Sequence, residues 1–454
     1  MYINNLCNIH NKNYHLNLKY EKIVKEEVGI LKKKKKVLSF VFIFIIIILS
    51  MIYTLGREQI ILGGNEGNRE EDTVKEDTTK EEDDVVVEPE VEEVIPVKIA
   101  VAGDVLYHGP QITAGYDEAI DDYYFDDDYQ YIKKYIDEAD LALVTVETTF
   151  GGEKLGYTGY PRFNAPSNVI DSLKKTGFDG INLASNHIMD YSSAFHHSIN
   201  EIKSRGLDVL GVRENEEIDR YMVKEINGMK IGISSYTYDS GRIGEQRTIN
   251  GIPIPIELTN NINCFGEQTL QEDLLDMKQT IEDMKADGAE YIIFLMHWGY
   301  EYHTMYSDTQ KQIAEALNSY GVDIIFGSHP HVVQPIEKIV NSTTQKETLV
   351  FYALGNFISN QREETMGNEK SEDGSIAQIE LDRREDGTVY LKNYEYIPTW
   401  VHKYTDKNNK LQYTVLPVEQ TLENYDSSTG LLPQHVIEAL KVSQTSTTGI
   451  MGQP

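Results

Sequence analysis

One apolar run near the N-terminus is long enough to cross a membrane. Residues 37–55 read VLSFVFIFIIIILSMIYTL and carry no charged side chain. A helix needs roughly 17–25 such residues to span a bilayer. A lysine run at 32–36 precedes the segment and an acidic stretch follows it. By the positive-inside rule, we expect a single-pass protein of the cell membrane with a cytoplasmic N-terminus and an extracytoplasmic C-terminal domain.

A cleaved signal peptide is the alternative explanation of this run. Its apolar core would be shorter, about 7–15 residues, and would end at small residues. Neither an Ala-x-Ala pattern nor a lipobox cysteine follows here, so an uncleaved anchor is favoured. The anchor then separates a basic cytoplasmic tail, residues 1–36, from an acidic linker, residues 56–95, whose polar composition predicts disorder.

Beyond the linker, short apolar runs alternate with amphipathic segments. Strands are expected at 97–103, 141–147, 178–184, 291–297 and 322–329, and helices at 167–175, 192–205, 267–287 and 309–320. Strands followed by helices are typical of a mostly parallel sheet. Hairpins are expected around Asn227-Gly228 and Asp386-Gly387, because these dipeptides favour tight turns, and they indicate a second, mixed sheet.

The predicted fold is therefore α/β, a layered α-β-β-α sandwich over residues 96–404. Residues 405–454 form a C-terminal extension, for which we expect a late strand, a short helix at about 432–443 and a loose tail. The formal net charge of −31 argues against a nucleic-acid partner, since phosphate backbones require basic surfaces. Cys7 and Cys264 lie on opposite sides of the predicted anchor and cannot pair, so disulfides do not support the fold.

Polar residues directly follow the apolar strands at five places. These are Gly103-Asp104, Glu147, Asn186-His187 with Asp190, His297, and His329-Pro330-His331. The carboxyl ends of strands are where α/β sheets place their sites, so we expect these side chains to converge. Asp, Glu, Asn and His supply the oxygen and nitrogen ligands suited to Mn, Zn or Fe. Carboxylates can also hold two cations about 3.5–4 Å apart, an arrangement that clamps a phosphoryl group.

Taken singly, each of these residues has an ordinary structural explanation. Asp104 could cap a turn, and His297 beside Trp298 could be a hydrogen-bonded core histidine. His187 could form a loop pair with Asn186, and the histidines around Pro330 could belong to a structured turn. One shared site explains all five clusters better than five coincidences. The remaining histidines of this region are expected to be structural or at the surface: His196, His197, His303, His402 and His435.

The order of these motifs resembles the CapA family of poly-γ-glutamate capsule proteins. The motifs are GD, then E, then NLASNHIMDY, HWGYEY, GSHPHVVQP and YALGNFI, spread over roughly residues 97–400. The segment YPRFNAP at 160–166 also resembles a family segment. The resemblance implies a calcineurin-like metallophosphoesterase fold and a part in the synthesis or export of poly-γ-glutamate. The implied partners are this or another cell-surface polymer and the membrane components of a capsule synthesis complex.

The resemblance also implies roles for individual residues. Two divalent cations would be held by Asp104, Glu147, Asn186, His297, His329 and His331. Asp104 and His331 resemble ligands of the first cation, and Glu147 resembles the bridging carboxylate. His187 resembles the proton donor of the catalytic pair His187 and Asp190. Asp190 and Glu301 resemble groups that orient histidines.

The chain departs from the general metallophosphoesterase pattern in two places. Val105 and Leu106 follow Asp104, so the usual Asp-x-His opening is missing, and His108 is a substitute at a different spacing. The bridging position is a glutamate within Thr145-Val146-Glu147, where the family more often has Asn before Leu-Glu. These departures predict that the first metal site is weak or that one metal is absent. They argue against phosphatase activity more than against metal binding.

The sequence leaves two main functions open. The first is a metal-dependent hydrolase of phosphoesters, or of a γ-linked amide, that uses a binuclear site at the cell surface. The second is a non-catalytic metal-binding scaffold or polymer-binding component of a cell-surface assembly complex. A plain anchored binding module is a third reading, with the least support from the motifs.

Overall fold

The computed structural model describes residues 95–425 and 432–453. The predicted basic tail (1–36), the predicted anchor (37–55) and all but the last residue of the predicted linker (56–95) lie outside these ranges. Those parts of the chain therefore remain predictions. Within 95–425 and 432–453, no helix is both long enough and apolar enough to cross a bilayer.

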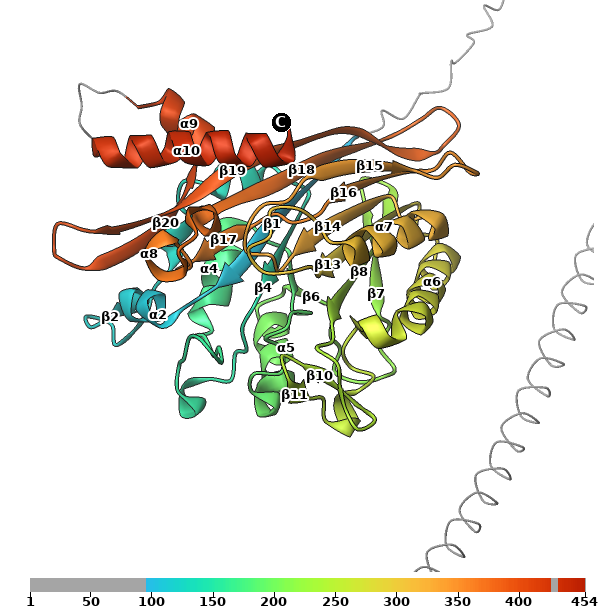
Figure 1. The fold of residues 1–454 in the computed structure, drawn as a ribbon, viewed down its shortest axis with the longest axis horizontal. Coiled ribbons are helices and arrows are strands. Elements are labelled where there is room, and N and C mark those ends of the chain that lie inside the picture. The colour runs from blue at the N-terminus through green and yellow to red at the C-terminus, as the bar shows by residue number, and fades with distance from the viewer. Residues whose placement is uncertain (1–94, 426–431, 454) are drawn as a thin grey trace, which may run out of the picture. The chain divides into compact units, whose positions relative to one another are not determined.

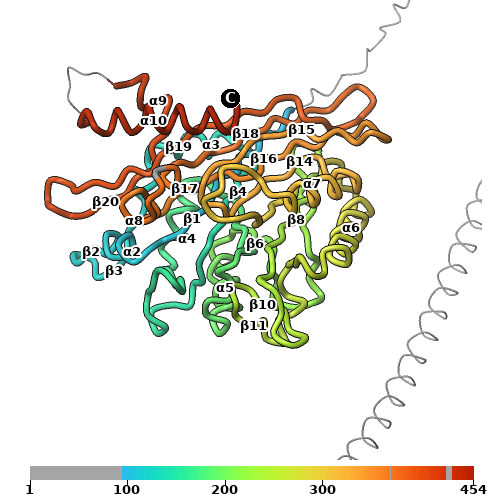
Figure 2. Tube along the Cα trace, in the orientation of Figure 1, coloured from blue at the N-terminus to red at the C-terminus, as the bar shows by residue number. Residues whose placement is uncertain are grey.

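The first of two mixed sheets is built on β1 (Val97–Leu106) (Figure 1). On one side follow β4 (Leu141–Val146), β5 (Gly180–Asn182) and β6 (Asp208–Leu210), all parallel. On the other side β18 (Asp373–Arg383), β19 (Val389–Thr405) and β20 (Leu411–Pro417) continue the sheet in antiparallel order. The short β17 (Asn356–Ser359) pairs in parallel with the end of β1. Figure 2 shows how these late strands lie beside the first strand of the domain.

The second sheet has a parallel centre with an antiparallel strand at each end. Its parallel strands are β12 (Cys264–Phe265), β8 (Met229–Tyr238), β13 (Tyr291–His297), β14 (Ile324–Ser328) and β16 (Glu347–Phe351), in that spatial order. β7 (Tyr221–Ile226) and β15 (Ile336–Val340) pair antiparallel with β8 and β16. Asn227 and Gly228 have φ of 47° and 74° between β7 and β8, as the predicted hairpin requires.

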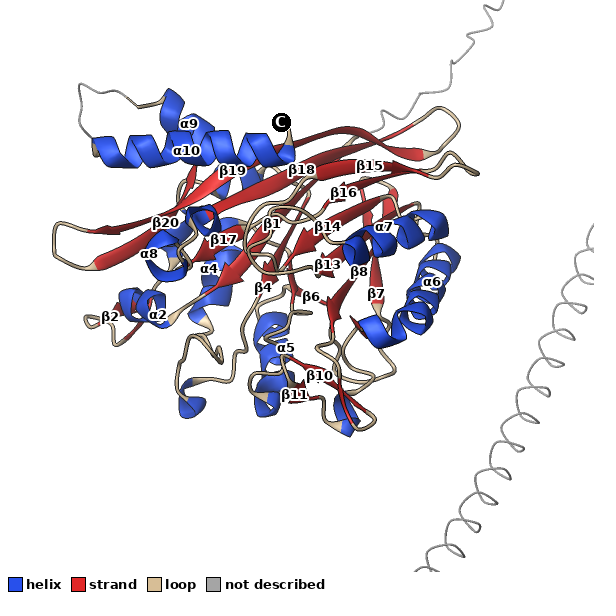
Figure 3. Ribbon diagram, viewed as in Figure 1, coloured by secondary structure: helices blue, strands red, loops and turns tan. Residues whose placement is uncertain are grey.

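Apolar side chains pack the two sheets face to face. Ile99 and Leu143 of the first sheet belong to the same buried cluster as Ile233, Ile293 and Phe326 of the second. Helices α4 (Asn168–Thr176) and α5 (Phe195–Ser204) cover the outer face of the first sheet, and α6 (Leu270–Ala286) and α7 (Asp308–Tyr320) cover that of the second (Figure 3). The predicted α/β class and its four layers are therefore observed.

Further short helices and strands lie along the chain between the main elements. They are α2 (Gly109–Gly115), β2 (Tyr116–Asp117), β3 (Asp122–Tyr123), α3 (Lys133–Asp137), β9 (Arg242–Ile243), β10 (Gln246–Ile249), β11 (Ile252–Pro253) and α8 (Glu363–Met366).

The C-terminal extension is more ordered than its polar composition predicts. The expected late strand is β20, which continues the first sheet. The expected short helix is α10 (Gln434–Met451), so the segment predicted as a loose tail is largely helical. Helix α10 and α9 (Val418–Glu423) share a buried cluster with Trp400 of β19 and Leu416 of β20. Packing on the sheet stabilises this helix, which extends to Met451, beyond the predicted end at about 443.

A bulge in β1 fixes the position of Asp104. The pairing of β1 with β4 shifts between Ala102 and Asp104, and the Asp104 N–H donates to the Gly355 carbonyl at 2.9 Å. A Cβ on Gly103 would overlap that same carbonyl oxygen. Glycine at 103 therefore permits the close approach of two backbones that holds Asp104 in place.

We expect Gly103→Ala to destabilise the protein by about 1–3 kcal/mol, because the added methyl group must push two strands apart. Gly109→Ala is the matched control, since a Cβ there meets no atom within 4 Å. Urea unfolding of both variants in the full-length protein measures the difference. Equal unfolding free energies for the two variants would contradict the assigned role of Gly103.

Candidate metal centre

The loops after the parallel strands of both sheets bring the predicted ligands together. Asp104 lies in β1 and Glu147 directly follows β4. On the second sheet, His297 ends β13, and His329 directly follows β14. Ligand atoms within 4.8 Å of one another form three groups of side chains: Glu147, His297 and His329; Asp104, Glu147 and His331; and Glu301, His329 and His331.

His331 and the two carboxylates form one half of the cluster. The Nδ1 atom of His331 lies 3.8 Å from Asp104 Oδ2 and 3.8 Å from Glu147 Oε1. The same nitrogen is 3.1 Å from Asn356 Oδ1. Asn356 lies in β17, and its Nδ2 donates to the Ser371 carbonyl at 2.8 Å. Asn356 therefore orients the His331 ring, a role that the sequence analysis did not identify.

His297 and Asn186 form the other half. His297 Nε2 lies 2.8 Å from Asn186 Oδ1 and 3.8 Å from Glu147 Oε2. Its other ring nitrogen, Nδ1, is 2.9 Å from Ser328 Oγ. A partner at the far nitrogen fixes the orientation of a ligating histidine. His297 Nε2 and Asn186 Oδ1 are close enough to ligate a single cation.

Four buried polar atoms of the cluster have no hydrogen-bond partner in the described residues. They are Asp104 Oδ1, both carboxylate oxygens of Glu147, and Nδ1 of His329. Asp104 and Glu147 are both 0% exposed. Burying a charged oxygen without a partner is costly, and such groups are normally paired or bound to a metal. The side chains present therefore fit divalent cations, whose charge would compensate both carboxylates.

Electrostatics set the protonation of the cluster. Burial raises the pKa of Asp104 from its ordinary value of 3.8 to about 7, although the His329 N–H, which donates to Oδ2 at 3.0 Å, opposes this. Burial and the nearby Asp104 charge raise the pKa of Glu147 well above its usual range. Burial lowers the pKa of His297 and His331 well below 6.5, and that of His329 to about 3. Neutral imidazoles are the form that binds metals.

Three residues at or near the cluster have a strained backbone. His329 and His331 have positive φ values of 97° and 58°, and Tyr302 has 63°. Residues other than glycine rarely adopt this region and persist there only when surrounding contacts hold them. The hydrogen bond from His329 N–H to Asp104 supplies one such contact. Such residues also occur in ordinary turns, as at Asn227, so the strain accompanies the convergence of ligands and does not by itself identify a site.

His187 and Asp190 form a separate pair beside the cluster. His187 Nδ1 lies 2.8 Å from Asp190 Oδ2, which also accepts the Phe163 N–H at 2.7 Å. The Arg162 guanidinium donates to the Asp190 carbonyl. Asp190 is fully buried, so it acts by holding the His187 ring. This pair belongs to none of the three ligand groups.

The two remaining candidates, His108 and Glu301, differ in their distance from the cluster. His108 belongs to none of the ligand groups. Its Nδ1 lies 3.3 Å from the Leu106 carbonyl and its ring packs edge-on against Phe163 at 5.2 Å, while burial lowers its pKa to about 4. Glu301 is exposed but offers an oxygen to the group with His329 and His331. Its position is that of a possible ligand and not only of an orienting group.

Tyr238 is a neighbour of the cluster that the sequence analysis missed. It ends β8, and its ring centroid lies 4.8 Å from that of His329 and 6.4 Å from that of His297, nearly parallel to the latter. Its position at the carboxyl end of a strand was the available signal. Tyrosine is not among the carboxylate, amide and imidazole ligands expected at this type of site, so its residue type does not single it out.

Adding Mn²⁺ is expected to raise the unfolding temperature of the metal-free protein more at pH 8 than at pH 5. The pKa values of Asp104 and Glu147 are raised in the folded state. Stability without metal is therefore lost as the pH rises from about 4 through about 7. The cation compensates the charges at pH 8, whereas protons compete with it at pH 5. Thermal unfolding at both pH values, with and without Mn²⁺, measures this; equal shifts would contradict it.

Glu147→Gln is expected to stabilise the metal-free protein at pH 8 by at least ~1 kcal/mol, because it removes a buried charge whose pKa is raised. The same change should abolish the Mn²⁺-dependent rise in unfolding temperature. Glu272→Gln, on the exposed face of α6, is the matched control. Loss of stability in metal-free Glu147→Gln, with the Mn²⁺ effect retained, would show that Glu147 serves a structural network.

The chain matches known proteins over its central region. The sequence model described as "Bacterial capsule synthesis protein PGA_cap" matches residues 98–361. Capsule biosynthesis protein CapA of Bacillus anthracis is 28% identical over 232 residues, or 50% of this chain and 50% of that protein. PGA biosynthesis protein CapA of Bacillus subtilis is 27% identical over 240 residues, or 52% and 54%. The chain thus spans about half the length of the curated relatives it matches.

Among solved structures, a candidate 5′-nucleotidase from Staphylococcus aureus, in complex with α-ketoglutarate, aligns with a TM-score of 0.38 and 14% identity. The alignment covers 76% of this chain and 58% of that one. A TM-score at this level establishes neither a shared fold nor a shared activity. The family match, in contrast, extends over more than half of the chain and contains all six predicted ligands. The protein therefore belongs to the bacterial capsule synthesis protein PGA_cap family.

Proposed function

We propose that this protein is a membrane-anchored component of poly-γ-glutamate capsule synthesis or export, and that its domain is a metal-dependent hydrolase. Family membership supports the capsule role, and the related proteins are described as acting in capsule and PGA biosynthesis. The observation that carries the chemistry is the set of buried, unpartnered carboxylate oxygens on Asp104 and Glu147, enclosed by three histidines. Such a set needs cationic compensation at neutral pH.

The proposed centre holds divalent cations, two in number, of the Mn, Zn or Fe type. When bound, these cations would supply Lewis-acid activation of water and neutralise charge on the group transferred. The side chains proposed to hold the cations converge in the structure, which supports this assignment. They are those of Asp104, Glu147, Asn186, His297, His329 and His331.

The side chains beside the centre handle the proton. Asp190 accepts a hydrogen bond from His187 Nδ1 and keeps the opposite ring nitrogen, Nε2, available. His187 Nε2 delivers a proton to the leaving oxygen or nitrogen as the phosphoester or γ-linked amide bond breaks and water adds. Removal of a group of this kind typically reduces turnover by about 10²–10⁴.

The proposed cellular arrangement follows from the N-terminal sequence. The apolar run at 37–55 anchors the chain, and the acidic linker at 56–95 separates the domain from the membrane surface. The domain then faces the polymer, or another cell-surface polymer, outside the cell. Its proposed partners are the membrane components of the capsule synthesis complex, and no nucleic acid.

A non-catalytic metal-binding scaffold is the second candidate function. It is favoured by the missing Asp-x-His opening and by His108, which packs on Phe163 and contributes to no ligand group. A centre with fewer ligands at its first position would retain a cation for structure or for bridging an anionic polymer, without turnover.

Metal content and turnover of the full-length protein, purified in mild detergent, test the proposal. We expect two metals per chain by mass spectrometry and hydrolysis of bis(4-nitrophenyl) phosphate, 4-nitrophenyl phosphate or poly-γ-glutamate oligomers. His187→Gln should keep both metals and lose turnover by at least ~100-fold, and His329→Ala should lose metal and turnover. His196→Ala, an exposed histidine on α5, is the control. Bound metal without turnover of any substrate would favour the scaffold.

A further inference from the structure

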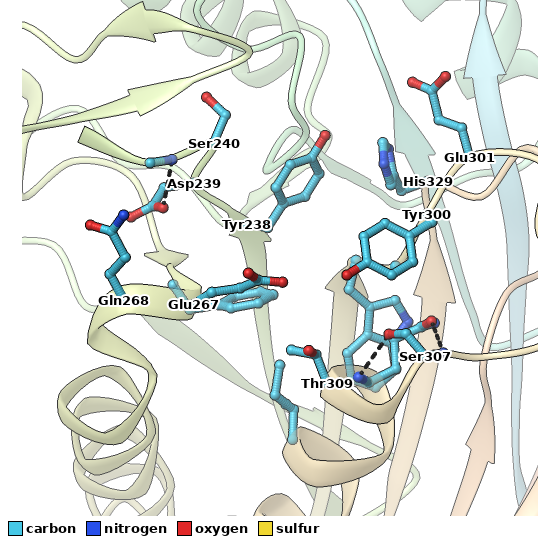
Figure 4. A pocket seen from close by; sticks show the side chains of 16 residues that line it. Tyr238, Asp239, Ser240, Glu267, Gln268, Tyr300, Glu301, Ser307, Thr309 and His329 are labelled. Carbon is cyan, nitrogen blue, oxygen red and sulfur yellow. Dashed lines mark hydrogen bonds between the residues drawn. The ribbon is translucent and has the colours of Figure 1, made fainter. Parts of the chain in front are cut away.

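A cavity of about 540 Å³ opens beside the metal centre (Figure 4). His329 and Glu301 of the centre lie on one side of it, and Glu267 lies on the other. The rings of Tyr238 and Tyr300 project between them. His329 is 3% exposed and its Nδ1 has no hydrogen-bond partner in the described residues. The cavity is thus continuous with the cluster that is proposed to carry out hydrolysis.

Aromatic and apolar groups form much of the cavity wall. Trp298, Phe265 and Ile313 are buried in the cluster under the second sheet and also line the cavity. Tyr300 is 51% exposed and Tyr238 packs against His329 with ring centroids 4.8 Å apart. Electron-rich faces of tyrosine and tryptophan attract cations placed within about 6 Å.

The charged groups of the wall are all acidic. Asp239, Glu267 and Glu301 line the cavity, and no lysine or arginine does. Asp239 is neutralised by Arg247 at 3.0 Å. Within the described residues, neither Glu267 nor Glu301 forms a salt bridge with a basic side chain. Because Glu301 is also a possible ligand of the centre, the Glu267 carboxylate is the group that attracts a cation at the other side of the cavity.

We propose that this cavity is a subsite for an ammonium-bearing group of the substrate, held by the Tyr238 and Tyr300 rings and by the Glu267 carboxylate. The inference rests on the hydrolase function proposed above and names the substrate class that its site accepts. Free carboxylates of a glutamate polymer do not suit this wall. An amine or quaternary ammonium group close to the bond that breaks suits this wall.

Two esters that differ only in charge test the subsite. 4-Nitrophenyl phosphorylcholine carries a quaternary ammonium group, and 4-nitrophenyl 3,3-dimethylbutyl phosphate carries carbon in place of nitrogen. In both, water adds to phosphorus and 4-nitrophenolate leaves, so the chemistry is the same. With the full-length, Mn²⁺-loaded protein, we expect kcat/KM about tenfold higher for the choline ester, since cation–π and carboxylate contacts favour the charged group.

Variants separate the subsite from the metal centre. Glu267→Gln should bring the ratio of the two kcat/KM values close to one by lowering kcat/KM for the choline ester. Glu272→Gln, outside the cavity on the exposed face of α6, should keep the ratio. A ratio near one in the unaltered protein, or faster hydrolysis of the uncharged ester, would overturn the proposal.

Calorimetric binding distinguishes failure of the subsite from failure of the hydrolase. If neither ester is hydrolysed, phosphocholine should still bind more tightly than 3,3-dimethylbutyl phosphate, and Glu267→Gln should remove the preference. That result would support the subsite while rejecting hydrolysis. Equal affinities of phosphocholine and 3,3-dimethylbutyl phosphate would reject the subsite.

Discussion

Two carboxylates, Asp104 and Glu147, lie buried in this domain, and within the described residues only imidazoles, and no lysine or arginine, lie within ion-pair distance of them. An isolated buried carboxylate is so unfavourable that proteins either protonate it or pair it with a cation. Here burial raises the pKa of both groups, and the surrounding imidazoles are neutral because burial lowers their pKa values. Without a cation the two carboxylates are therefore held toward their protonated forms, and a divalent cation would supply the positive charge that lets them ionise.

The two-sheet framework makes this arrangement possible. Parallel strands of both sheets end at the same edge, so β1 and β4 supply the carboxylates while β13 and β14 deliver the histidines. The apolar interface between the sheets holds these ends in register. At the edge itself, the bulge beside Gly103 and the left-handed residues His329 and His331 adjust the backbone locally. Packing of the sheets compensates for strain at the site.

The surroundings of the centre divide into two regions of different character. In one of them, His187 is held by Asp190, which also accepts the Phe163 N–H. The other is the acidic, aromatic cavity around Tyr238 and Glu267, which neither His187 nor Asp190 lines. The whole chain is strongly acidic, and a centre of this charge accepts cations readily but admits a polyanion only with accompanying cations. The group proposed to transfer the proton and the groups proposed to select the substrate are thus separate sets of residues.

The sequence by itself determined the order of strands and helices, the α/β class and the residues that meet at the site, because apolar periodicity and the polar residues at strand ends are local signals. It also carried the motif order by which the chain resembled its family, which the match over residues 98–361 confirms.

Sequence could not show that Asn356 supports His331, that His108 turns toward Phe163, or that Tyr238 borders the centre. These contacts join residues that are distant in the chain or depend on rotamer and backbone geometry. Helix α10 was predicted to end at about 443 but extends to Met451, and it packs against β19 and β20. Local pattern thus decided which residues were available, and the packing of two sheets decided which of them touch.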